Sequence, residues 1–126
     1  MGAPLGRLEY LYVASADVAK DLAYYRDVLG ARVVWDFSEF GTRVAAVELG
    51  ARPPLYVLAG HRQAPHVLPI FAVDDLPRVE RELRARGWTP EGPSVAVPDG
   101  PCYLFKDPSG NEVGLLGSVR PRALER

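Results

Sequence analysis

Two side chains of this 126-residue chain could carry acid–base chemistry, and they stand far apart in the sequence. His66 carries an imidazole, which can take up or release a proton near neutral pH. Glu112 carries a carboxylate, which could assist in proton transfer. For His66 three roles stay open: a general base, a group that orients a ligand through a hydrogen bond, or a residue satisfied by a neighbouring strand. His66 and Glu112 are therefore the candidate catalytic residues.

Aromatic residues with polar tips indicate a different chemistry, the binding of a flat or amphipathic organic molecule. Aromatic rings stack on such a ligand, and phenol and imidazole groups fix its orientation by hydrogen bonds. Strand alternation assigns the predicted ligand-binding residues to the inner face of the expected strands. They are Tyr10, Tyr12, Trp35, Tyr56, His66, Cys102 and Glu112. The alternative for each tyrosine is a place in the core with its hydroxyl reaching solvent.

A module that occurs twice would position these side chains. Residues 8–31 and 66–88 each read as an apolar strand, an Asp that can cap a helix, an amphipathic helix and a Gly that ends it. Three strand-like runs separated by turn residues follow each helix. They cover residues 31–37, 42–49 and 54–58, and residues 94–97, 102–106 and 112–116. The sequence therefore predicts an α+β fold of two tandem βαβββ modules, at about residues 7–58 and 66–117 of one domain spanning residues 1–126.

Both expected helices carry start and stop signals. Asp17 can cap the first helix and Gly30 can end it, while Asp74 or Asp75 can cap the second and Gly87 can end it. The buried stripes are expected at Val18, Leu22, Tyr25 and Leu29 in the first helix and at Leu76, Val79 and Leu83 in the second. Each helix should therefore cover one face of the strands in its own module.

The composition is that of a soluble globular protein, with 48% hydrophobic and 25% charged residues. The net charge of −1, with basic and acidic residues interleaved, argues against nucleic-acid binding. No signal peptide and no run of ~20 apolar residues is evident, so we expect a cytoplasmic protein without membrane contact. Cys102 is alone, which excludes an intrachain disulfide, and it reads as a small strand residue rather than a nucleophile. The basic tail at residues 118–126 is expected to fray.

Three motifs follow one another in an order that matches the two modules. They are DLAYYRDVLGARV at residues 21–33, IFAVDDL at residues 70–76 and LFKDPSGNEVGLL at residues 104–116. Together they resemble the vicinal oxygen chelate superfamily, which contains glyoxalase, extradiol dioxygenases, and the fosfomycin and bleomycin resistance proteins. The resemblance covers about residues 8–116. It implies that the two modules form a curled mixed sheet around a shared cleft, the glyoxalase/bleomycin resistance fold.

Catalytic members of that superfamily hold a divalent metal with four side chains, two from each module. The resemblance places these positions at Tyr10, on or beside Tyr56, at His66 and at Gly114. Only His66 is a usual metal ligand, whereas such ions need three or four converging N, O or S donors. Phenols titrate near pH ~10 and are poor substitutes. Glu112 or His61 would rebuild only a partial site, so we expect no metal and no cofactor.

Three functions from different classes are compatible with these features. The first is metal-independent binding of an aromatic or amphipathic small molecule, such as an antibiotic or natural product, as the resemblance to bleomycin resistance proteins implies. The alternative is a glyoxalase-like lyase or isomerase, with an atypical metal site or with His66 in proton transfer with Tyr10 or Glu112. The third is a ligand-sensing or purely structural dimer. The residues at the metal positions favour the first, and the resemblance implies a homodimer in each case.

Overall fold

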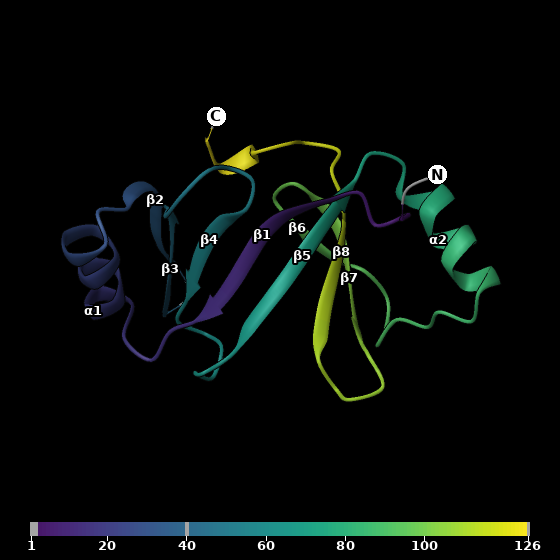
Figure 1. Cartoon of the computed structure of the whole chain (residues 1–126), viewed down its shortest axis with the longest axis horizontal. Helices are drawn as coiled ribbons and strands as arrows, with labels where there is room; N and C mark the ends of the chain where they lie inside the picture. The colour runs from purple at the N-terminus through teal and green to yellow at the C-terminus, as the bar shows by residue number, and fades with distance from the viewer. Residues whose placement is uncertain (1–2, 40, 126) are drawn as a thin grey trace. The chain divides into compact units, whose positions relative to one another are not determined.

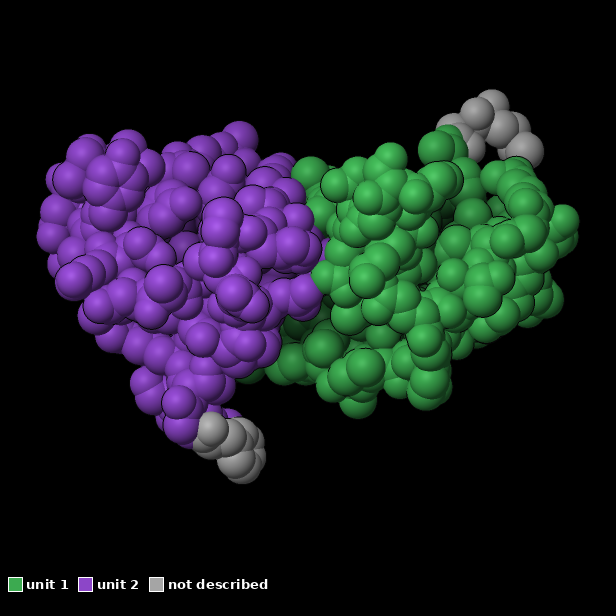
Figure 2. All heavy atoms as spheres, turned by 90° about the horizontal axis from the view of Figure 1, so that it is seen from below, with its two compact units in different colours: residues 1–8, 69–124, 126 green, residues 9–68, 125 purple. Residues whose placement is uncertain are grey.

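The computed structural model describes residues 3–39 and 41–125, so the predicted turn residue Phe40 lies outside the described residues. The helices and strands follow in the order β1 (Arg7–Ala14), α1 (Val18–Ala23), η1 (Tyr24–Val28), β2 (Arg32–Glu39), β3 (Thr42–Glu48), β4 (Leu55–Ala59), β5 (Val67–Val73), α2 (Leu76–Ala85), β6 (Val95–Val97), β7 (Gly100–Lys106), β8 (Glu112–Gly117) and η2 (Ala123–Glu125) (Figure 1). The chain divides into two compact units (Figure 2). Unit 2 comprises residues 9–68 and 125, and unit 1 comprises residues 1–8, 69–124 and 126.

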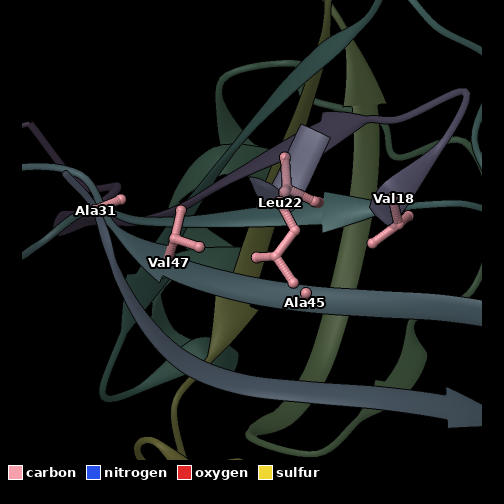
Figure 3. Close-up of a cluster of buried hydrophobic side chains, with 6 residues drawn as sticks. Val18, Leu22, Ala31, Ala45 and Val47 are labelled. Carbon is pink, nitrogen blue, oxygen red and sulfur yellow. The ribbon is translucent and has the colours of Figure 1, made fainter. Parts of the chain in front are cut away.

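In unit 2 the strands lie in the order β2-β3-β4-β1. Strands β1 and β4 run parallel, and the other neighbours run antiparallel. Helix α1 contacts β3 and β4 and covers one face of this sheet. The buried side chains between helix and sheet are Val18, Leu22, Ala31, Ala45, Val47 and Leu58 (Figure 3). The α1 side of the sheet is therefore a closed apolar core.

The first helix confirms the predicted cap but not the whole predicted stripe. The Asp17 carboxylate accepts a hydrogen bond from the backbone N–H of Lys20 at 3.1 Å. After α1 the chain continues as the π-helical turn η1, in which the Leu29 N–H donates to the Tyr24 carbonyl at 3.2 Å. A π turn is wider than an α-helical turn and rotates the following side chains around the axis. Leu29 is consequently 45% exposed, so its predicted place in the buried stripe is wrong.

In unit 1 the strands lie in the order β5-β8-β7-β6, with β5 and β8 parallel and the other neighbours antiparallel. Asp75, rather than Asp74, caps α2, since its carboxylate accepts a hydrogen bond from the Arg78 N–H at 3.2 Å. The core between α2 and the sheet contains Val73, Leu76, Val79 and Leu115, with Leu83, Trp88, Tyr103 and Phe105 packed against it. The second predicted stripe is thus confirmed.

In the second half of the chain, the start of β7 differs from the prediction and the turn at residues 107–111 agrees with it. Strand β7 begins at Gly100, two residues before the predicted start. Gly100 has a φ of +152° and approaches the Gly117 carbonyl too closely to carry a side chain, so this position requires glycine. The predicted turn at residues 107–111 is confirmed in detail. Its Asp107 carboxylate accepts hydrogen bonds from the backbone N–H groups of Ser109 and Asn111 at 3.0 and 2.9 Å.

The C-terminal tail does not fray as predicted, because contacts with distant residues fix it as far as residue 125. The Ala123 N–H donates to the buried Asp99 carboxylate at 2.9 Å, and Glu125 pairs with Arg52 at 2.8 Å. The prediction of fraying failed because the sequence does not show these long-range partners. In the described part of the chain, no helix has the length and apolar character needed to cross a membrane.

Candidate functional site

One face of the unit 2 sheet packs against α1, and the other face carries aromatic residues on its two outer strands, β2 and β1. Strand pairing places Trp35 of β2 beside Ala46 of β3, and Ala46 beside Val57 of β4. Val57 in turn pairs with Tyr12 of β1. Paired residues point to the same face of a sheet, so Trp35, Ala46, Val57 and Tyr12 form one row across it. This aromatic row crosses three strand spacings, or ~14 Å.

The aromatic rings on this face pack against small and aliphatic residues. Ala46 and Val57 are buried, and Tyr10, Tyr12 and Trp35 pack against them while remaining half-buried themselves. Phe37 adds a further ring: its centroid lies 5.5 Å from that of Trp35, and it is 42% exposed. Three of the predicted ligand-binding aromatics therefore share one face, with part of each ring open to solvent.

Tyr56 does not belong to this face, and its predicted place with the other tyrosines is wrong. It pairs with Leu11 and packs against the core under α1, where its ring centroid lies 5.9 Å from that of Tyr25. The cause lies in the sequence of β4, which is apolar at nearly every position. Both alternating sets of β4 side chains are apolar, so alternation does not show which set faces α1 and which set faces the opposite side of the sheet.

The imidazole next to the aromatic row belongs to His61, in the connector between β4 and β5. Its Nε2 lies 3.4 Å from the Tyr12 hydroxyl, and the two ring centroids are 5.7 Å apart in an edge-on arrangement. Burial raises the pKa of Tyr12, against a smaller opposing effect of the Arg62 charge, so the phenol keeps its proton at neutral pH. The sequence offered one clue to this position. Because β1 and β4 run parallel, residues that follow β4 lie at the end of β1.

His66 directly precedes β5 and is tied down through its backbone. Its carbonyl oxygen accepts a hydrogen bond from the Ala14 N–H at 2.9 Å, and the side chain is half-buried. Its role as a ligand-binding or proton-transferring residue stays a prediction.

The two helix caps fix the register of the repeat and change the assignment of the metal positions. Tyr10 lies seven residues before the capping Asp17, and Leu68 lies seven residues before the capping Asp75. Leu68 is therefore the repeat equivalent of Tyr10. In this register, the third metal position that the family resemblance implies falls on Leu68, two residues after His66, and Leu68 is 2% exposed.

Strand pairing extends the same register to the other two positions. Tyr12 and Ile70 lie at equivalent places, five residues before their caps. Tyr12 pairs with Val57, and Ile70 pairs with Gly114. Val57, beside Tyr56, is thus the repeat equivalent of Gly114. In this register, the four metal positions that the family resemblance implies fall on Tyr10, Val57, Leu68 and Gly114.

These residues do not fit a chelated divalent metal. Zn²⁺ and related ions take imidazole, thiolate or carboxylate donors, and this set offers one phenol. Within residues 3–39 and 41–125, no group of three or more His, Cys, Asp and Glu side chains has a geometry that could hold a metal ion. The disagreement with the superfamily pattern therefore rests on the chemistry of the residues present.

In unit 1 the predicted residues Cys102 and Glu112 share the sheet face opposite α2. Cys102 pairs with Leu116, is 6% exposed, and has a pKa raised by burial to about 11. It remains a thiol at neutral pH and cannot serve as a nucleophile there. Next to it, a Cβ at Gly114 would lie 3.0 Å from the Ile70 side chain and 3.6 Å from the Cys102 sulfur, so the space that a side chain would need is filled. Glu112 opens β8 opposite Lys106.

Two further features lie away from these faces. Arg43 makes a two-pronged ion pair with Asp36, at 2.9 and 2.7 Å, which lowers the pKa of that carboxyl. A cavity of about 430 Å³ in unit 1 lies between residues 3–7, the end of β5 and α2. Its charged lining includes the pairs Arg7–Asp74 and Arg78–Glu82. None of the predicted site residues lines this cavity.

Comparison with known proteins gives one family and a set of similar folds. The family described as Glyoxalase/Bleomycin resistance protein/Dioxygenase superfamily matches residues 7–115. Methylmalonyl-CoA epimerase from Mycobacterium tuberculosis matches with a TM-score of 0.72 and 19% identity, over 86% of this chain and 85% of that chain. A variant of methylmalonyl-CoA epimerase from Streptomyces coelicolor in complex with 2-nitronate-propionyl-CoA matches with a TM-score of 0.68 and 16% identity, over 90% of this chain and 98% of that chain.

A hypothetical protein from Bacillus halodurans C-125 matches with a TM-score of 0.70 and 13% identity, over 86% of this chain and 91% of that chain. No curated protein matches the chain. At these identities the structural likenesses bear on the fold alone. They confirm the predicted fold class, two βαβββ modules in a curled mixed sheet.

Proposed function

We propose that this chain, which belongs to the glyoxalase/bleomycin resistance protein/dioxygenase superfamily, binds a small aromatic or amphipathic molecule without a chelated metal. The observation that carries the proposal is the set of residues at the four metal positions. They are Tyr10, Val57, Leu68 and Gly114. One phenol and two aliphatic side chains cannot supply three or four converging donors. Activity that depends on a metal would need a different donor set.

The aromatic face of unit 2 supports the same proposal. Tyr12 and Trp35 are half-buried at the two sides of the aromatic row, and Phe37 stays 42% exposed. Exposed ring surface next to hydroxyl groups is suited to a flat ligand, because rings stack on it and phenols fix its orientation. The bleomycin resistance proteins named in the superfamily make an antibiotic or a natural product one candidate for this ligand.

Metal content is the first test. Protein purified without chelator should contain far less than one divalent ion per chain by elemental analysis, and added Zn²⁺, Ni²⁺ or Mn²⁺ should not raise the thermal midpoint. A Tyr10→Phe variant removes the only donor in the set and should behave like the parent protein. One tightly bound divalent ion per chain would contradict the proposal.

Ligand binding is the second test, with biphenyl-4-carboxylate and bleomycin as probes. A ligand that binds only the folded chain stabilises it by about 2.7 kcal/mol at one hundred times its Kd. We expect such a shift with at least one probe, and we expect Trp35→Leu to reduce it. Tyr24→Leu is the matched control, because Tyr24 is an aromatic residue with 51% exposure outside the aromatic face. An equal loss of binding in both variants would speak against the aromatic face as the site.

Proton transfer is the second candidate function, since the similar solved structures include methylmalonyl-CoA epimerases and His66 is a half-buried imidazole at the start of β5. The test is incubation with methylmalonyl-CoA in deuterated water. Under the binding proposal no deuterium enters the substrate. Turnover that is abolished in a folded His66→Ala variant would favour the lyase or isomerase alternative.

A homodimer remains part of the proposal. Small single-domain chains most often assemble as symmetric pairs. Light scattering coupled to size exclusion should then give twice the chain mass of 13.8 kDa. A mass equal to one chain at micromolar concentration would contradict this expectation.

A further inference from the structure

The connector at residues 60–65 is held in place at both ends, although its sequence has no regular pattern. At its start, the Gly60 N–H donates to the Arg43 carbonyl at 3.0 Å. Gly60 is also closely packed, since a Cβ there would lie 3.0 Å from the same carbonyl oxygen. At its end, the His66 carbonyl accepts the hydrogen bond from Ala14 at 2.9 Å. The connector is therefore a fixed part of unit 2 and can hold a side chain in one position.

The side chain that it holds over the sheet is His61. Its Nε2 lies 3.4 Å from the Tyr12 hydroxyl, at one side of the aromatic row. His61 itself is exposed, so a ligand can reach the imidazole while the Tyr12 ring is partly covered. Arg62 follows directly, and its positive charge acts on the Tyr12 phenol. One side of the row therefore combines a phenol, an imidazole and a nearby positive charge.

We propose that His61 and Tyr12 form the point where the site recognises an acidic oxygen group, a carboxylate or phenolate, on an aromatic ligand. The apolar body of the ligand then extends along the row towards Trp35 and Phe37. This inference rests on the proposed binding function and adds the ligand class and the residues that select it.

The chemistry of the two groups matches an anionic oxygen. Within the pair one group donates to the other, in a direction set by the imidazole tautomer, and a second N–H or O–H of the pair is then left to donate to a ligand. A hydrogen bond to an ionised acceptor is stronger than one between neutral groups. Burial keeps the Tyr12 phenol in its protonated, donating form. The nearby charge of Arg62 favours an anion over a neutral group of the same shape. The ~14 Å length of the row suits an elongated aromatic acid.

The test compares two probes of the same shape, biphenyl-4-carboxylate and its neutral analogue biphenyl-4-carboxamide, by titration calorimetry on the full chain. His61→Gln and Tyr12→Phe should each weaken carboxylate binding by about tenfold, the effect of one charge-assisted hydrogen bond. The same variants should change carboxamide binding by less than about twofold. Gln63→Ala, from the same connector, and Tyr103→Phe, which loses a tyrosine hydroxyl in unit 1, are the matched controls.

The outcomes separate this inference from the function on which it rests. If neither probe binds the parent protein, the inference fails together with the proposed binding of such ligands. If both probes bind and His61→Gln changes neither, the binding function stands and the recognition point is wrong. Perturbation of the His61 ring signals in the NMR spectrum of the parent protein by the carboxylate provides a readout that needs no variant. No perturbation at saturation would overturn the inference.

Discussion

Leu68 is the repeat equivalent of Tyr10, and its surroundings are those of a core residue. It is 2% exposed, whereas its neighbour Val67 is 54% exposed. We expect Leu68→Ala to lower the free energy of unfolding by about 2–4 kcal/mol, because the substitution leaves a cavity. Val67→Ala should lower it by less than about 0.5 kcal/mol. Urea unfolding of both variants measures the difference, and equal losses would contradict the burial of Leu68.

The buried Cys102 thiol predicts how the free energy of unfolding depends on pH. Its pKa is raised from 9.0 in the unfolded chain to about 11 by burial, so the folded protein holds the thiol proton more tightly. The stabilising effect is complete below pH 9 and is lost as the pH rises through about 11. Unfolding free energy measured from pH 8 to pH 11 should therefore fall more steeply in the parent protein than in Cys102→Ala. Alkylation by iodoacetamide at pH 8 should also be slow until the protein is unfolded.

Single residues also show where sequence reasoning reaches its limit. Tyr10, Tyr12 and Trp35 share one sheet face, as strand alternation from the aromatic positions predicts. Tyr56 was misassigned because Leu55–Ala59 is apolar on both faces. The residue type alone favours His66 for a metal position, whereas the cap at Asp75 sets a register in which Leu68 is equivalent to Tyr10.

Among the structural elements, α2 offers a test of that register. Asp75 caps the helix, while the adjacent Asp74 has 88% of its side chain exposed. Asp75→Ala should lower the free energy of unfolding by about 1 kcal/mol, the usual cost of a lost helix cap. Asp74→Ala removes only an exposed ion pair with Arg7 at 3.5 Å and should cost less than about 0.5 kcal/mol. If Asp74→Ala is the more damaging change, the register and the metal assignments based on it are wrong.

The elements themselves were largely predictable, and the exceptions have physical causes. Every predicted strand is present, since an apolar run bounded by turn residues marks each one. The π turn η1 was missed, because a helical apolar stripe looks the same whether or not one wider turn interrupts it. The connector at residues 60–65, GHRQAP, has no hydrophobic periodicity from which its conformation could be predicted. Its fixed position depends on backbone hydrogen bonds, which side-chain patterns do not reveal.

For the molecule as a whole, the repeat was sufficient to predict the fold class but only part of the candidate site. The repeat describes the caps, the stripes and the strands, all of which depend on local patterns. The candidate site depends on which residues from separate strands lie side by side. The row from Trp35 to Tyr12 is an example, since three strand registers are needed to define it. The shared cleft stays a prediction.

The ion pair that attaches Glu125 near the C-terminus to Arg52 should contribute to the stability of the protein. Arg52 is 13% exposed at its side chain and pairs with both Glu48 and Glu125, at 3.3 and 2.8 Å. Glu125→Gln should lower the free energy of unfolding by about 1–2 kcal/mol, because it removes a charged partner from a mostly buried guanidinium. Glu82→Gln breaks an exposed pair and should have an effect below about 0.5 kcal/mol. Thermal unfolding of both variants measures the difference. If their unfolding midpoints are indistinguishable, the pair between Arg52 and Glu125 does not stabilise the protein.

The packing around Gly114 bears on which side chains this position of β8 could accept. A carboxylate introduced there by a single substitution would meet the Ile70 side chain, which already lies 3.0 Å from where a Cβ would be. Overfilling a packed site of this kind usually costs about 1–3 kcal/mol. A side chain at residue 114 would therefore require the Ile70 side chain to move by a few tenths of an ångström. How much larger a residue the strand can carry there depends on the freedom of Ile70 to change its rotamer.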